Sequence, residues 1–228
     1  MVYLFSVPAF LLPSPDRVIL TLFESMPFLF HHAMVTAFEM LAGLLIGTWL
    51  GVSMGLLLLL IPPVGRWLFP LFITSQALPV FALAPLLTLW LGFGFSAKIA
   101  MACLIIYFPI VSNFYDGLRR THAQYIYAAK SMGANDWQTL IYIRFAFSLP
   151  YLGSGLKIAA TVTPIGVIVG EWVGGSQGLG YLMIYANGRM DTDLMFAALL
   201  MIMLLGLGLH MLVQKLADFL PKLPSKLF

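Results

Sequence analysis

Long apolar runs that carry almost no charge constrain this chain more than any other feature. Residues 67–95 contain no charged side chain, and residues 33–61 contain a single one, Glu39. A helix needs about 20 apolar residues to span a bilayer, so each run is long enough to cross. Over the whole chain 61% of the residues are hydrophobic and 9% are charged, far from the composition of soluble domains. The sequence therefore predicts an all-α integral membrane protein, a polytopic bundle of five to six transmembrane helices.

The predicted spans follow from where these runs begin and end. They lie at residues 33–61, 67–95, 99–115, 151–173 and 194–214. Residues 2–12 are apolar but too short to cross fully, and we interpret them as the remnant of a first span. Prolines should prevent one straight helix over residues 67–95, and Pro164 should interrupt the span at 151–173. Residues 14–32 have apolar side chains at helical spacing, which predicts a helix along the membrane surface.

Three regions with different membrane positions are therefore expected. Residues 1–32 form a partial span and a surface helix, residues 33–216 the transmembrane domain, and residues 217–228 a cytoplasmic tail. Placing residues 117–150 in the cytoplasm agrees with the positive-inside rule, with nine basic residues inside against three outside. The inside set is Arg66, Arg119, Arg120, Lys130, Arg144, Lys157, Lys215, Lys222 and Lys226, and the outside set is Arg17, Lys98 and Arg189.

Composition and motifs also exclude several classes of function. The net charge of +3 is spread over short loops without an aromatic-interleaved basic patch, so nucleic-acid binding is not indicated. Cys103 is the single cysteine, which excludes an internal disulfide framework. The chain has no G-x-x-x-x-G-K-[ST] phosphate loop and no His/Cys/Glu cluster at metal-ligand spacing. We therefore expect no cofactor, no metal and no ATP hydrolysis in this chain.

Residues 117–150 form the one long polar interruption in the chain. Thr121 and Gln124 have the spacing of a capping box, so a short helix is expected over residues 122–132. Gly133 is a natural left-handed stop for that helix. Asn135 or Asp136 can cap a second helix through Phe147, and Pro150 should then break the chain. The prediction is a helix-turn-helix elbow, with a plain connecting loop as the alternative.

The elbow carries a motif with a family resemblance. The string YAAKSMGANDW, followed by FSLP at residues 147–150, resembles the EAA loop of ABC-importer permeases. That pattern is Glu-Ala-Ala, three residues, Gly, and then a hydrophobic-x-Leu-Pro ending. Ala128, Ala129, Gly133, Leu149 and Pro150 match it, whereas Tyr127 stands where the family has Glu. The flanking strings LPVFALAPLLTLWLGFG and GGSQGLGYLM look like the subfamily that imports sulfonates, nitrate, taurine and thiamine-pyrimidine precursors.

The resemblance implies a permease subunit of an ABC importer in the bacterial inner membrane. It implies a homodimer with two ATPase subunits, which bind ATP and Mg, docked on the elbows, and an extracytoplasmic binding protein on the outer face. The implied ATPase-coupling residues are Tyr127, Ala128, Ala129, Gly133, Ala134, Leu149 and Pro150. The segment QGLGYLMIYANGRMDTDLMFAAL looks most like permeases for the thiamine pyrimidine precursor, with a sulfonate, taurine or nitrate as the next substrates.

Polar and glycine positions within the spans supply further expectations. The translocation-path candidates are Thr74, Ser75, Gln76, Asn113, Thr161, Thr163 and Glu171. For those beside proline breaks, the alternative is that they satisfy backbone carbonyls that the prolines leave free. Gly43, Gly47, Gly51 and Gly55 recur every four residues, which predicts close helix packing, within the subunit or across a dimer.

Two rival functions remain open from the residues. The segment from Gly174 to Gly178 matches G-x-S-x-G, so an intramembrane serine protease with Ser176 as nucleophile is one of them. Against it, His210 should lie roughly 24 Å deeper in its helix, whereas a base must come within about 3 Å. The other rival is an ion-gradient-driven transporter, which needs ionisable residues deep in the membrane. Glu39, Lys157 and Glu171 come closest, each near a predicted span end.

Overall fold

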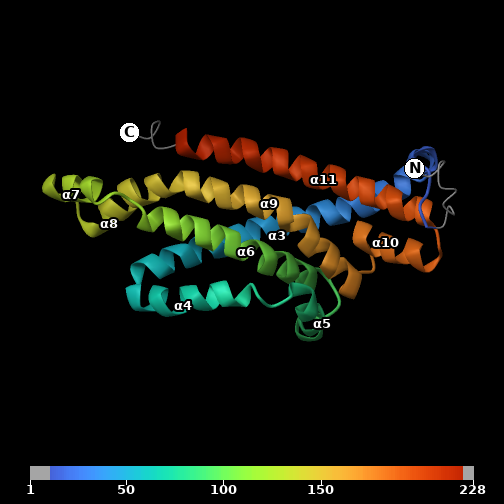
Figure 1. Cartoon of the computed structure of the whole chain (residues 1–228), viewed down its shortest axis with the longest axis horizontal. Helices are drawn as coiled ribbons and strands as arrows, with labels where there is room; N and C mark the ends of the chain where they lie inside the picture. The colour runs from blue at the N-terminus through green and yellow to red at the C-terminus, as the bar shows by residue number, and fades with distance from the viewer. Residues whose placement is uncertain (1–10, 223–228) are drawn as a thin grey trace. The chain divides into compact units, whose positions relative to one another are not determined.

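The computed structural model describes residues 11–222, and its regular structure is helical throughout that range (Figure 1). The all-α fold class is therefore confirmed. The α-helices are α2 (Pro15–Glu24), α3 (Met26–Leu60), α4 (Pro62–Ser75), α5 (Val80–Leu91), α6 (Phe95–Arg119), α7 (Ala123–Ser131), α8 (Asp136–Gln138), α9 (Ala146–Gly174), α10 (Leu179–Gly188) and α11 (Thr192–Phe219). A π-helix, η1 (Thr139–Phe145), joins α8 to α9, and a 3-10 turn, η2 (Leu220–Lys222), follows α11.

Within the described range, four helical segments are long and apolar enough to cross a membrane. They are Met26–Leu60, Phe95–Arg119, Asp136–Gly174 and Thr192–Lys222. The pair α4 and α5 passes the same test together as a broken span, which makes five. The break at residues 76–79 confirms that residues 67–95 do not form one straight helix. The sixth expected element, at residues 2–12, lies almost entirely outside the described residues.

The bounds of the first helices differ from the prediction. The expected surface helix at residues 14–32 ends at Glu24, and α3 starts two residues later at Met26. Pro27 falls in the first turn of α3, where a missing N–H breaks no intrahelical bond. Residues 26–32 therefore belong to the long helix. At the other end, α11 continues to Phe219, past the expected start of the tail at residue 217.

Two prolines that were expected to break helices do not, so both expectations were wrong. Pro150 lies inside α9, in the second turn after the π-helix ends at Phe145. In α9 the N–H of residue 150 would pair with the carbonyl of Ala146, four residues earlier. Proline removes that one hydrogen bond, and the chain stays helical on both sides of it; nearby, the Ser148 hydroxyl donates to the Phe145 carbonyl at 2.7 Å. Pro164 also lies within α9, where Gly206 of α11 leaves room for its ring.

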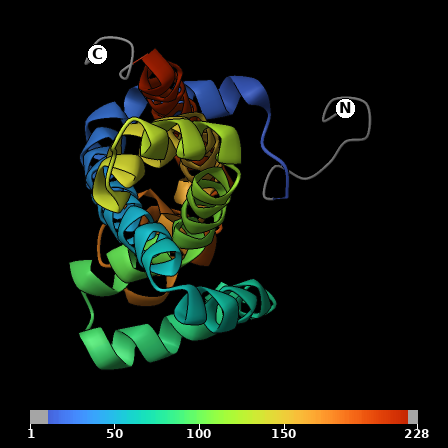
Figure 2. The ribbon, with the colours of Figure 1, turned by 90° about the vertical axis from the view of Figure 1, so that its left-hand side faces the viewer.

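Contacts divide the chain into two compact units. Unit 1 comprises residues 1–44, 80–103 and 163–208, and unit 2 comprises residues 45–79, 104–162 and 209–228. In unit 1, Val18 of α2, Leu29 of α3, Leu179 of α10 and Ala197 of α11 share one buried apolar cluster. Unit 2 has a cluster of its own around Leu58, Val111 and Tyr115, and its elbow helices α7 and α8 face the viewer in Figure 2.

The glycine stripe on α3 packs against α6 within each unit. In unit 1 a side chain at Gly43 would place its Cβ 2.7 Å from the Cβ of Ala102. In unit 2 a Cβ at Gly51 would lie 2.6 Å from the Cγ2 of Ile110, closer than side chains approach. At these positions the predicted close packing is confirmed, and it is a contact within the subunit.

Candidate functional site

A buried polar cluster in unit 1 begins with a stripe on α3. His32, Thr36 and Glu39 are separated by four and three residues, so they share one face of the helix, and all three are buried. Lys98 of α6 and Glu171 of α9 are buried with them. Burying so many polar groups is costly unless each is paired, so their partners decide whether the cluster is stable.

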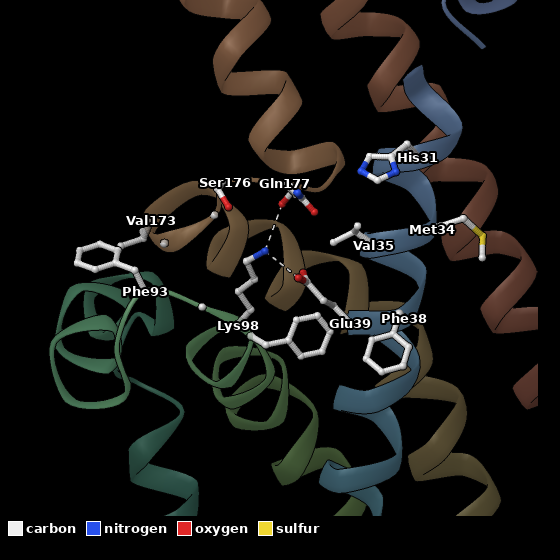
Figure 3. Close-up of a pocket in the computed structure, with 14 residues that line it drawn as sticks. His31, Met34, Val35, Phe38, Glu39, Phe93, Lys98, Val173, Ser176 and Gln177 are labelled. Atoms are coloured by element: carbon white, nitrogen blue, oxygen red, sulfur yellow. Dashed lines mark hydrogen bonds and ion pairs between the residues drawn. The ribbon is translucent and has the colours of Figure 1, made fainter. Parts of the chain in front are cut away.

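Lys98 and Glu39 form a buried ion pair. The Lys98 Nζ lies 2.7 Å from Oε1 of Glu39, and the two side chains are only 6% and 0% exposed. The same ammonium donates to the backbone oxygen of Gln177 at 3.2 Å, which ties the loop after α9 to the pair (Figure 3). Inside a membrane protein such charges are expected to neutralise one another. Lys98 is therefore not the exposed outer charge that the topology count assumed.

Glu171 holds the start of α10. One carboxylate oxygen accepts from the Thr36 hydroxyl at 2.7 Å, and the other accepts from the N–H of Gly180 at 2.5 Å. Thr36 in turn accepts from the N–H of Leu179 at 2.8 Å, and Nδ1 of His32 accepts from the N–H of Gly178 at 3.0 Å. The free N–H groups at this helix N-terminus are thus satisfied by α3 and α9, and a carboxylate there also complements the helix dipole.

The glycines of the loop before α10 are required by this arrangement. Gly178 has φ +112°, and a Cβ there would overlap the Glu171 carboxylate. A Cβ at Gly180 would lie 2.7 Å from the Oε2 of Glu171. The G-x-S-x-G match therefore belongs to a loop that packs over a buried carboxylate, and its glycines have a structural reason independent of Ser176.

A cavity of about 760 Å³ adjoins the ion pair in unit 1. Phe38, Phe93 and Phe95 supply aromatic wall, while Glu39 and Lys98 supply a polar end. The remaining lining residues come from α3, the turn before α6, the end of α9 and the loop after it: His31, Met34, Val35, Gly94, Val173, Gly174, Gly175, Ser176 and Gln177. Figure 3 shows the labelled members around the Lys98 ammonium. Such a cavity suits a small molecule with a flat apolar body and a polar edge.

The elbow in unit 2 has the predicted short helix and turn, but its second helix continues through η1 into α9, and one predicted cap is wrong. The short helix α7 ends at Ser131, and Gly133 follows it with a φ of +89°, which confirms the left-handed stop. Asn135 caps α8 through a reciprocal capping box with Gln138, as one of the two predicted caps. The capping box predicted at Thr121 is wrong, because the Thr121 hydroxyl donates to the carbonyl of Leu118 and His122 occupies the cap position.

The structure brings most of the implied coupling residues together on the elbow. Tyr127, Ala128 and Gly133 are exposed, with Ala129 and Ala134 half-buried beside them. The neighbouring Tyr125, Met132 and Trp137 are also exposed, so the elbow presents an unusually apolar surface. Leu149 and Pro150 belong to the first turns of α9 instead, where Leu149 is buried.

The translocation-path candidates are divided between the units. Thr74 and Ser75 donate to carbonyls of their own helix, Pro70 at 2.9 Å and Phe72 at 2.7 Å. Asn113 donates to the Pro109 carbonyl at 2.8 Å, one turn earlier in α6. Gln76 is exposed and Thr163 is buried. Whether any of these residues lines the path stays a prediction.

Thr161 bears on the protease alternative. Its hydroxyl donates to the Lys157 carbonyl at 2.9 Å and lies 3.1 Å from Nδ1 of His210, both within unit 2. His210 is thus engaged by Thr161. No strand precedes the Ser176 loop in the part of the chain that the structure describes, so a nucleophile elbow of the hydrolase type is absent there.

Sequence reasoning missed the polar stripe and its partner lysine. Glu39 was placed near a span end, yet α3 begins at Met26 and puts it well inside the helix. The signal was present in the spacing of His32, Thr36 and Glu39. An acidic residue among apolar neighbours, with a lysine at the start of a later charge-poor span, is the pattern of an intramembrane pair.

Comparison with known proteins gives consistent matches over most of the chain. The sequence profile of the family described as binding-protein-dependent transport system inner membrane component matches residues 43–220. A probable ABC transporter permease protein of Haemophilus influenzae is 47% identical over 205 residues, covering 90% of this chain and 84% of that protein. The formylaminopyrimidine transport permease protein ThiX of Halalkalibacterium halodurans is 35% identical, covering 92% and 85%. The riboflavin transport system permease protein RibX of Chloroflexus aurantiacus is also 35% identical, covering 93% and 80%.

Proposed function

The chain belongs to the family of binding-protein-dependent transport system inner membrane components, the multi-pass permeases of ABC transporters, and we propose that it forms the translocation path for a small nitrogen heterocycle. A formylaminopyrimidine, the thiamine pyrimidine precursor of the sequence prediction, is the favoured substrate. The single observation that carries the coupling part of the proposal is α7, a short exposed helix that Gly133 ends in a left-handed turn.

The favoured substrate class rests on the relatives and on the cavity in unit 1. Two relatives, each 35% identical, are named for formylaminopyrimidine and riboflavin, which are both nitrogen heteroaromatics. The cavity offers Phe38, Phe93 and Phe95 to the face of such a ring. A sulfonate, taurine or nitrate would instead need an unpaired cation. Lys98 is the one lysine or arginine among the described lining residues, and its charge is paired with Glu39.

Uptake measurements separate these substrate classes. Cells that express the whole importer are expected to accumulate labelled formylaminopyrimidine in preference to labelled taurine. Accumulation of taurine alone would reject the heterocycle assignment without affecting the assignment as a permease.

In the proposed assembly this chain pairs with a second copy, two ATPase subunits and an extracytoplasmic binding protein. The ATPases bind ATP and Mg and dock on the elbow through the exposed Tyr127, Ala128 and Gly133. Closure of the ATPase pair moves α7 and switches the spans from inward-facing to outward-facing. Because Tyr127 replaces the glutamate of the family pattern, its contact with the ATPase is one of packing.

Gly133 provides a sharp test of this docking. Gly133→Val forces a β-branched residue into a left-handed conformation, at a cost of about 1–3 kcal/mol, and should weaken ATPase co-purification about fivefold or more. Gly133→Asn should restore docking, since Asn tolerates this conformation. The matched control is Gly92→Val, because Gly92 has φ +81° and, like Gly133, has nothing within 4 Å of an added Cβ.

The Gly92→Val control separates the general effect of backbone strain from a specific effect on ATPase docking. Gly92 lies in unit 1, away from the elbow in sequence, so Gly92→Val should leave co-purification of the ATPase unchanged. Full docking and full stimulation of ATP hydrolysis in Gly133→Val would reduce the elbow to a connector.

The ionisable groups buried in unit 1 would suit an ion-gradient-driven transporter, but the family uses separate ATPase subunits as its energy source.

A further inference from the structure

Three arginines surround a second cavity, in unit 2. The cavity has a volume of about 510 Å³, and its lining includes Arg66, Arg119 and Arg144. They come from α4, α6 and η1, respectively. Apolar and aromatic residues complete the lining: Leu58, Leu59, Pro62, Gly65, Phe69, Pro70 and Tyr115. The cavity therefore combines a concentrated positive charge with an apolar wall.

Each arginine lies close to the end of an apolar helix. Arg119 is the last residue of α6, Arg66 is in the first turns of α4, and Arg144 is next to the last residue of η1, just before α9. Residues at the ends of spans lie at the level of the lipid headgroups. The distribution of basic residues along the sequence predicts that all three lie on the cytoplasmic side, where the leaflet carries anionic lipids.

The charge of this cavity is not balanced by the protein. Among the described residues, no carboxylate forms an ion pair with Arg66, Arg119 or Arg144, and no acidic residue lines the cavity. Arg120, the residue after Arg119, differs from these three arginines because its guanidinium lies 3.8 Å from the carboxylate of Asp116. An array of three guanidinium groups without a carboxylate favours a ligand that brings its own negative charge.

Aromatic packing holds one arginine in place. The guanidinium of Arg119 lies over the ring of Tyr115, 5.4 Å from its centroid, and that ring packs against Phe69 at 5.2 Å. Tyr115 is buried. Gly65 makes the close approach of α4 possible, since a Cβ there would lie 2.8 Å from the Tyr115 hydroxyl. The site is thus built by packing between α3, α4 and α6 and does not depend on flexible side chains alone.

We propose that this cavity binds the phosphodiester headgroup of an anionic phospholipid, with Arg66, Arg119 and Arg144 around the phosphate and an acyl chain against the half-buried Leu59 and Phe69. Arginine suits phosphate because its planar group donates two parallel hydrogen bonds. The apolar wall favours a lipid over a free phosphate, which has nothing to place there. The inference is independent of the transported substrate and of ATPase docking.

The first measurement uses the unmodified full chain. Native mass spectrometry in a neutral detergent, with phosphatidylglycerol or phosphatidylcholine titrated in, should show tighter retention of phosphatidylglycerol. Equal retention of the two lipids would overturn the proposal. Displacement of phosphatidylglycerol by inorganic phosphate would also overturn it, because the site would then be a simple anion site.

The second measurement uses variants matched in position and charge. Arg66→Gln, Arg119→Gln and Arg144→Gln should each weaken phosphatidylglycerol binding about fivefold, from roughly the contribution of one basic residue at an anionic surface. Arg120→Gln removes the same charge from the neighbouring, paired position and should change binding less than about twofold. An equal loss in Arg120→Gln would show that the effect is unspecific surface charge, against the proposal.

Lysine substitutions keep the test valid if a glutamine variant folds poorly. Arg119→Lys and Arg144→Lys retain the charge but lose the paired donors, so they should retain the lipid preference at reduced affinity. The proposal of a shared phosphate site would be contradicted if the well-folded lysine variants lost the preference for phosphatidylglycerol while Arg66→Gln kept it.

Discussion

Two ion pairs in this chain have opposite surroundings. In unit 1 Lys98 and Glu39 are 2.7 Å apart with exposures of 6% and 0%, whereas in unit 2 Lys130 and Asp136 are 3.0 Å apart with exposures of 52% and 91%. In the first pair, Lys98 also donates a hydrogen bond to the Gln177 carbonyl in the loop after α9. The pair adjoins the polar cluster whose side chains accept hydrogen bonds from the N-terminus of α10. The second lies on the elbow. The two pairs have nearly equal distances but contribute differently to stability. Breaking the buried pair leaves an uncompensated charge, whereas the exposed pair contributes little.

The two regions should also differ completely in access from outside the cell. In a Cys103→Ala background, Ser176→Cys in the exposed loop of unit 1 should react with an impermeant maleimide in intact cells. Asn135→Cys on the elbow should react only after lysis, because the charge distribution places residues 117–150 in the cytoplasm. Labelling of Asn135→Cys without lysis would overturn the topology and with it the docking of an ATPase on the elbow.

The next largest contrast is expected in stability. Lys98→Met leaves the Glu39 carboxylate buried without its partner and should lower stability by about 3–5 kcal/mol, measured as thermal unfolding in detergent. Lys130→Met removes an exposed charge of the same size and should cost less than about 1 kcal/mol. The double change Glu39→Leu with Lys98→Met should recover much of the loss, and a double variant as unstable as Lys98→Met would show that the pair's charge is not the cause.

The smallest contrast compares two caps on the elbow. Asn135→Ala removes the side chain that accepts from the Gln138 N–H at 2.8 Å and should destabilise the start of α8 by about 1 kcal/mol. Hydrogen exchange of residues 136–145 measures this local opening. Thr121→Ala should leave exchange in α7 unchanged, since Thr121 bonds to Leu118 and does not cap α7. Faster hydrogen exchange in α7 of the Thr121→Ala variant would show that Thr121 does cap α7, as the sequence predicted.

The parts predicted correctly are those that local composition determines. Apolar length located the helices that can span a membrane, and Gly133 and Asn135 located the elbow because turn and cap chemistry act over a few residues. The predictions that Pro150 and Pro164 break the helix were wrong because they used the same kind of local rule. Both prolines lie within α9, and at Pro164 the helix persists because Gly206 on α11 leaves room for the ring, a tertiary contact that a local rule cannot include.

The polar cluster was beyond a segment-by-segment analysis because its members are distant in sequence. Glu39 looked isolated, and Lys98 looked like an outer loop charge. Only the packing of α3 against α6 brings them together. The spacing of His32, Thr36 and Glu39 predicts a polar face, but which residues it meets depends on the tertiary structure. Glu171 was identified as a site candidate, although its role in holding α10 was not.

The separation of Glu39 and Lys98 along the chain has a consequence for biosynthesis. The two residues are 59 positions apart, so at a synthesis rate of about 5–20 residues per second the lysine leaves the ribosome about 3 to 12 s after the glutamate. During that interval the first long helix carries a carboxylate without its counter-ion. Transfer of that helix into lipid should therefore be delayed until the lysine arrives, and the two helices should leave the translocation channel together.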